Sequence, residues 1–120
     1  MLNPEVPGLF FVGRASSISS ILTYCLQTHW TGELIKGNLK LPSVDGMKQN
    51  IDEMKVWKRS WIPISPARSA RLIAHTQHYH DELLNDLGIN PLRKTGIFAP
   101  LKELIAPYES GDYATVFAKP

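Results

Sequence analysis

An unbroken apolar run near the start of the chain predicts a buried strand. The segment from Leu9 to Val12 (LFFV) contains no polar side chain, and Pro7-Gly8 and Gly13 bound it. Runs without alternation are typical of strands covered on both faces, as in parallel sheets. Such a strand must pair its backbone N–H and C=O groups. The run therefore indicates a sheet, and the remaining strands of that sheet have to be found.

Apolar residues at helical spacing predict three helices further along the chain. We expect them over residues 17–36, 43–60 and 66–87. Gly37 ends the first helix and Ser43 caps the second; Pro66 takes the first position of the third, and Gly88 ends it. The tail is weakly patterned. Its residues 99–108 (APLKELIAPY) predict one or two helical turns, and residues 113–118 predict either a short strand or a final turn.

These elements together predict an α/β fragment that is mostly helical, with one buried parallel-type strand and about three helices. A two-stranded ribbon is marginal, and each unpaired buried backbone group costs about 1–3 kcal/mol. Either the fold is an unusual helical one or the sheet belongs to residues outside this chain, and we favour the second. We expect residues 1–37 to be the last strand and helix of a sheet domain, residues 38–91 to be two helices packed on it, and residues 92–120 to be an irregular tail.

Composition and charge narrow the class of protein. The chain has 120 residues, 43% hydrophobic and 20% charged, as expected for one globular domain. A net charge of +2 gives no argument for a nucleic-acid partner or an anionic membrane. The single cysteine, Cys25, excludes an internal disulfide, suits a reducing cytoplasmic compartment and is expected to be buried. Residues 15–32 are uncharged but too polar for a membrane span, and we expect no signal peptide.

The loop after the predicted strand is the candidate binding site. Ligands of open α/β sheets bind beyond the carboxyl ends of the strands, where Gly13 stands. A glycine allows close approach of the backbone, and Ala15, Ser16 and Ser17 keep the loop narrow. The next helix would direct free N–H groups at an electron-rich ring or a phosphate. Arg14 lies beside this site, and a structural salt bridge is an equal alternative for it.

Several elements, in their order along the chain, resemble the carboxyl-terminal region of flavin-containing monooxygenases. The element PGLFFVG, which ends at Gly13, resembles the family's P-x-L-x-F-I-G strand. A Q-x-x-W element follows at Gln27 and Trp30, and a G-x-x-x-L-P-S connector ends at Ser43. A methionine then opens the next helix at Met47, and HYHDELLNDLGINPLRK resembles a later helix of the family.

The resemblance, over about residues 4–95, implies a place in a flavin pocket. It implies that the strand and helix complete an FAD-binding Rossmann-like domain, in an enzyme where NADPH reduces FAD and oxygen is used to oxygenate a small-molecule substrate. It implies no catalytic residue here, and it implies that Gln27 orders the helix or the pocket rather than doing chemistry. The cofactor-binding residues it implies are Gly13, Arg14, Ala15, Ser16 and Gln27.

The chain departs from this family at the cofactor-binding loops. Family members carry one G-x-G-x-x-G loop for the FAD pyrophosphate and a second for NADPH. No glycines of this chain have that spacing. We therefore expect the chain to be inactive alone, with the remainder of a flavoprotein as its partner. The alternative is a non-enzymatic, small helical interaction module that folds alone.

The third predicted helix carries further candidates. His75 and His78 share one face and suggest a metal site, but His80 points elsewhere, so three ligands do not converge. We favour solvated or hydrogen-bonded histidines. The acidic residues of the same helix are interpreted as surface charge: Asp81, Glu82 and Asp86.

Overall fold

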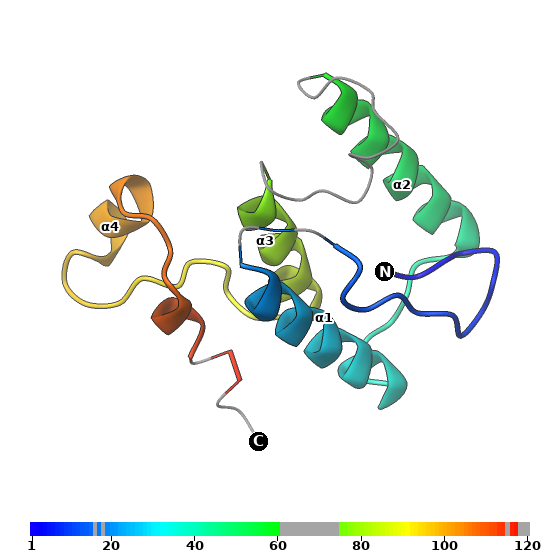
Figure 1. Cartoon of the computed structure of the whole chain (residues 1–120), viewed down its shortest axis with the longest axis horizontal. Coiled ribbons are helices and arrows are strands. Elements are labelled where there is room, and N and C mark those ends of the chain that lie inside the picture. The colour runs from blue at the N-terminus through cyan, green and yellow to red at the C-terminus, as the bar shows by residue number, and fades with distance from the viewer. Residues whose placement is uncertain (16, 18, 61–74, 115, 118–120) are drawn as a thin grey trace.

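The computed structural model describes residues 1–15, 17, 19–60, 75–114 and 116–117. Its elements are α1 (Ser20–Ile35), α2 (Val44–Arg59), α3 (Thr76–Asp86), α4 (Ala99–Ile105) and the short 3-10 helix η2 (Ser110–Tyr113). Figure 1 shows α1 and α3 packed side by side at the centre, with α2 and α4 standing on opposite sides of the pair. The mostly helical character predicted from the sequence is confirmed for these residues.

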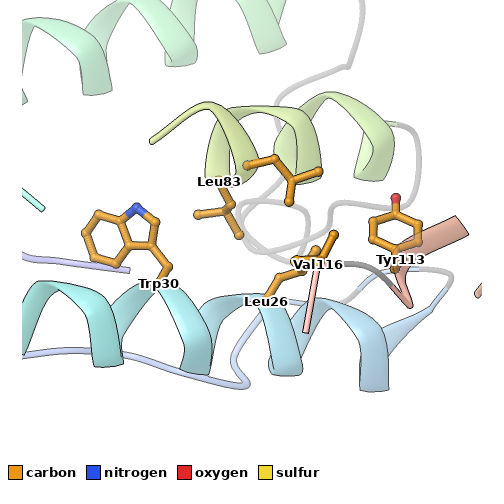
Figure 2. Close-up of a cluster of buried hydrophobic side chains, with 6 residues drawn as sticks. Leu26, Trp30, Leu83, Tyr113 and Val116 are labelled. Atoms are coloured by element: carbon orange, nitrogen blue, oxygen red, sulfur yellow. The ribbon is translucent and has the colours of Figure 1, made fainter. Parts of the chain in front are cut away.

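The hydrophobic core lies between α1, α3 and the segment after η2. Figure 2 shows Leu26 and Trp30 of α1 facing Leu83 of α3, with Val116 drawn near Leu26 and Tyr113 at one end of the cluster. The spacing of the apolar residues along α1 and α3 brings these side chains to the facing surfaces. This core involves no residue of the predicted strand.

Local signals set the ends of the helices. The Ser43 hydroxyl accepts a hydrogen bond from the Gly46 N–H and caps α2. Gly37 and Gly88, which follow α1 and α3, both have positive φ, as the predicted helix ends require. The first two predicted helices are confirmed within a few residues at each end. The third is confirmed over Thr76–Asp86, and its predicted beginning over residues 66–74 lies outside the described residues.

The buried strand from Leu9 to Val12 is not confirmed. The described residues contain no strand, only an isolated antiparallel bridge between Leu2 and Phe10. Leu9, Phe11 and Val12 are 39%, 45% and 43% exposed. The physical reason is that the described part of the chain offers this segment no second strand and no covering layer.

The outer elements are largely solvated. Neither α2 nor α4 has a buried residue, and Cys25, expected to be buried, is exposed on α1. The tail forms α4 within the predicted helical turns. The 3-10 helix η2 ends at Tyr113, the first residue of the range 113–118 for which the sequence predicts a strand or a final turn. Among the described residues, no helix combines the length and the hydropathy that a membrane crossing requires.

Candidate functional site

The segment of residues 13–17, the candidate site, is anchored at its first residue by a buried side chain of α1. The Gly13 N–H donates to Gln27 Oε1 at 2.9 Å. Gly13 has φ +79°, a left-handed conformation that glycine adopts without strain. A Cβ at this position would meet only the Tyr24 ring, at 4.0 Å. Its backbone therefore stays open to the approach of a ligand, although its N–H is already engaged.

The last residue of the segment, Ser17, is anchored in the same way, one turn earlier on α1. Its Oγ lies 2.7 Å from Thr23 Oγ1, and its carbonyl accepts from the Ser20 hydroxyl at 3.1 Å. Thr23 and Gln27 stand four residues apart and so share one face of α1. Both side chains are buried. Two polar residues on a buried helix face thus hold the two ends of the 13–17 segment.

Helix α3 holds these two side chains in turn, through two consecutive residues. Gln27 Nε2 donates to the Tyr79 hydroxyl at 2.8 Å, and Thr23 Oγ1 lies 2.8 Å from His80 Nε2. His80 Nδ1 lies 2.9 Å from the Tyr113 hydroxyl. Each end of the segment is thereby connected through α1 to α3, and one connection continues into η2.

The Thr23 hydroxyl lies within hydrogen-bonding distance of three groups. The Ser19 carbonyl is 3.0 Å away, Ser17 Oγ is 2.7 Å away and His80 Nε2 is 2.8 Å away. A neutral His80 has one N–H donor and one acceptor nitrogen, so either tautomer bonds both Thr23 and Tyr113. Burial, reinforced by the charge of Arg93, lowers the pKa of His80 to about 4, in agreement with a neutral ring.

The remaining predicted site residues are Arg14, Ala15, Ser16 and Gln27. Arg14 is exposed, Ala15 is half-buried, and Ser16 lies outside the described residues. Both ends of the Gln27 amide are engaged by Gly13 and Tyr79, so this side chain positions the backbone of the segment.

The Q-x-x-W element joins α1 to α3. Trp30 Nε1 donates to Asp86 Oδ2 at 2.9 Å, and Gln27, on the preceding turn, bonds Tyr79. Asp86 therefore has a partner that the surface-charge interpretation missed. Asp81 has one as well, since Arg93 Nη1 donates to it at 2.8 Å. The sequence analysis also missed the role of Thr23, which bonds Ser17 and His80. The only sign of this role in the sequence is a polar residue on the apolar face of a predicted helix.

The three histidines separate as expected. His75 and His78 contact the ring of Trp57, with centroids 5.6 and 4.8 Å away, whereas His80 lies in the core. No group of three or more metal-ligating side chains occurs in the part of the chain that the structure describes. His80 is a hydrogen-bonded histidine, and His78 Nδ1 lies 3.6 Å from Glu82.

Comparisons with known proteins give relatives of one kind. An Arabidopsis thaliana protein named "Probable flavin-containing monooxygenase 1" is 33% identical over 114 residues, which are 93% of this chain and 20% of that protein. Flavin-containing monooxygenase 3 of Canis lupus familiaris is 33% identical over 88 residues, 72% of this chain and 16% of that protein. FAD-dependent monooxygenase DEP4 of Fusarium langsethiae is 28% identical over 108 residues, 90% of this chain and 18% of that protein.

The chain spans about a fifth of the length of these curated relatives. No family model and no solved structure matches it. The relatives confirm the resemblance that rests on the strand, Q-x-x-W and L-P-S elements. The chain is a homologue of flavin-containing and FAD-dependent monooxygenases over a part of their length.

Proposed function

We propose that this chain is the carboxyl-terminal part of an FAD- and NADPH-dependent monooxygenase and contributes one wall of its flavin pocket. The observation that carries the proposal is the anchoring of the 13–17 segment. Its first residue is fixed by Gln27 and its last by Thr23, and both of these buried side chains are held by α3. Gly13 and Ser17 are thus held in place before any ligand binds, which lowers the cost of ordering them.

The residues present fit one edge of a flavin. Gly13 and Arg14 are exposed, and a Cβ at Gly13 would meet only the Tyr24 ring, at 4.0 Å, so a flat ring could approach the backbone there closely. Because the Gly13 N–H is bonded to Gln27, contact at this residue would be by packing rather than by donation. When bound, the flavin supplies the electron transfer between NADPH and oxygen. Gln27 would position the Gly13 backbone against the flavin, because it accepts a hydrogen bond from the Gly13 N–H.

The rest of the pocket would come from the remainder of the flavoprotein. The chain has no G-x-G-x-x-G loop for the FAD pyrophosphate or for NADPH, so we propose that it is inactive alone. The exposed apolar residues Leu9, Phe11 and Val12 support a partner that covers them. A small-molecule substrate and a cytoplasmic location are part of the same proposal, the latter because of the single cysteine.

The native gene product tests this proposal. An antibody raised against residues 40–60 would isolate it from its source cells, for measurement of its mass and of flavin released by heating. We expect a product heavier than the 13.5 kDa of this chain, with FAD bound and NADPH oxidised in air. In that product, Gly13→Val should lower the FAD content, whereas Gly96→Val, at a glycine with φ +94° and open space around it, should not. A 13.5 kDa product without flavin would overturn the proposal.

One observation favours a second candidate, a helical interaction module without enzymatic activity. The hydrophobic core is formed by α1, α3 and the segment after η2, without the strand residues. A chain with such a core could fold alone. Limited proteolysis of the isolated 120-residue chain separates the two functions. A module would resist cleavage throughout, whereas a piece of a larger protein would be cut within residues 1–15 and would unfold readily.

A further inference from the structure

We propose that Tyr113 and His80 are positioning residues for Ser17, the last residue of the candidate site, so that the carboxyl-terminal part of the chain sets the position of a residue near the other end of the sequence. The significance for a flavin rests on the function proposed above. The coupling itself rests on the contacts of this chain alone.

A continuous series of side-chain hydrogen bonds joins the two regions. Tyr113 bonds His80 Nδ1 at 2.9 Å, His80 Nε2 bonds Thr23 at 2.8 Å, and Thr23 bonds Ser17 at 2.7 Å. The bonds pass from η2 through α3 and α1 to Ser17, and Figure 1 shows α1 and α3 side by side at the centre of the molecule.

Burial makes this series act as a unit. Thr23, His80 and Tyr113 are 0%, 2% and 3% exposed. Loss of one bond would leave a buried donor or acceptor unpaired, since water cannot readily replace the partner. Both ring nitrogens of His80 are bonded, so the ring cannot turn without breaking its bonds on both sides. A displacement of Tyr113 is therefore transmitted to Thr23 and to Ser17.

The ring of Tyr113 is itself held in place by Arg93. The guanidinium of Arg93 lies 4.5 Å from the centroid of the Tyr113 ring and 4.0 Å from that of Tyr108, and Asp81 accepts from Arg93 at 2.8 Å. Tyr108 thus shares the cation–π contact but has no bond to His80, because its hydroxyl donates to Glu103. The two tyrosines form a matched pair in which only one connects to the 13–17 segment.

The experiment compares Tyr113→Phe with Tyr108→Phe in the full-length gene product. Both changes remove one hydroxyl and keep the ring over Arg93. We expect amide hydrogen exchange within residues 13–19 to rise about tenfold in Tyr113→Phe and to stay unchanged in Tyr108→Phe. Equal exchange in the two variants would overturn the inference.

Two substitutions at Thr23 separate the loss of this hydrogen bond from a general loss of stability. Thr23→Val removes the hydroxyl and should raise exchange at residues 13–19, whereas Thr23→Ser should restore it. The nitrogen-15 spectrum of His80 should show a displaced Nδ1 signal in Tyr113→Phe. An Nδ1 signal equal to that of the wild type would contradict the inference. If the wild type binds no flavin, the proposed function fails, while the exchange data still decide the coupling.

Discussion

The backbone N–H of Gly13 donates to the side-chain oxygen of Gln27, 2.9 Å away. The side-chain nitrogen of Gln27 in turn donates to the Tyr79 hydroxyl. One buried glutamine thus joins a segment near the start of the chain to two helices. The glutamine of the Q-x-x-W element acts here on backbone geometry. The following predictions test this arrangement and the packing around it.

Replacing Gln27 by leucine should destabilise the chain. Leucine fills a similar volume but leaves the Gly13 N–H and the Tyr79 hydroxyl without this partner, so we expect a loss of about 2–3 kcal/mol in the free energy of unfolding. Urea unfolding would measure it. The control is Thr28→Val, because the Thr28 hydroxyl is exposed and bonds only the Tyr24 carbonyl of its own helix. Equal midpoints for the two variants would contradict a structural role for Gln27.

Two glycine-to-alanine changes should act in opposite directions. Gly13→Ala forces a side chain into φ +79° and should cost about 1 kcal/mol or more, although the nearest atom would be 4.0 Å away. Gly32→Ala lies inside α1 with open space around the new Cβ and should stabilise by about 0.5–1 kcal/mol. Thermal unfolding of both variants measures the difference. A loss of stability in Gly32→Ala would show that α1 is packed differently.

The Trp30–Asp86 hydrogen bond should appear as a coupling between α1 and α3. Trp30→Phe, Asp86→Ala and the double variant form a cycle, and we expect a coupling of about 1 kcal/mol in the free energy of unfolding. Asp52→Ala is the control, because Asp52 lies exposed on α2 and pairs with Lys55. A coupling near zero between Trp30 and Asp86, equal to that between Trp30 and Asp52, would contradict the bond.

Stability should fall as the solution is acidified from pH 6.5 towards pH 4. Burial lowers the pKa of His80 to about 4 in the folded chain, so between these values the unfolded chain binds a proton that the folded chain does not. The free energy of unfolding then rises with pH, by up to about 1.4 kcal/mol per unit for one group. The pKa of His75 is also lowered to about 4, mainly by burial, and it adds a second group of the same sign.

Urea unfolding at pH 7 and at pH 5 measures this dependence. His80→Gln should be less stable than the wild type at pH 7 and should lose less stability between the two pH values. Parallel losses in the two proteins would contradict a neutral, buried His80.

Local signals in the sequence were enough to predict the helices. Ser43 and the glycines after α1 and α3 act through hydrogen bonds and φ angles within a few residues, so their effect can be read without knowing the fold. The resemblance to flavin-containing monooxygenases also came from short elements and their order, and the relatives confirmed it.

The sequence misled where the outcome depends on residues far along the chain. The run from Leu9 to Val12 has the pattern of a buried strand, but burial requires neighbours that the described chain does not supply. Asp86 is exposed and Asp81 is partly exposed, in agreement with the surface-charge interpretation. Their partners, Trp30 and Arg93, follow no spacing rule relative to them, so these two bonds could not be predicted from the sequence.

Short-range patterns were enough to predict both ends of α1 and α2, the end of α3 and the proteins to which the chain is related. That Thr23, His80 and Tyr113 form one series of bonds, and that Gln27 fixes Gly13, depended on how the helices pack together. The reason is that a polar side chain on a helix has no fixed partner until packing removes water from around it and leaves a single donor or acceptor within reach.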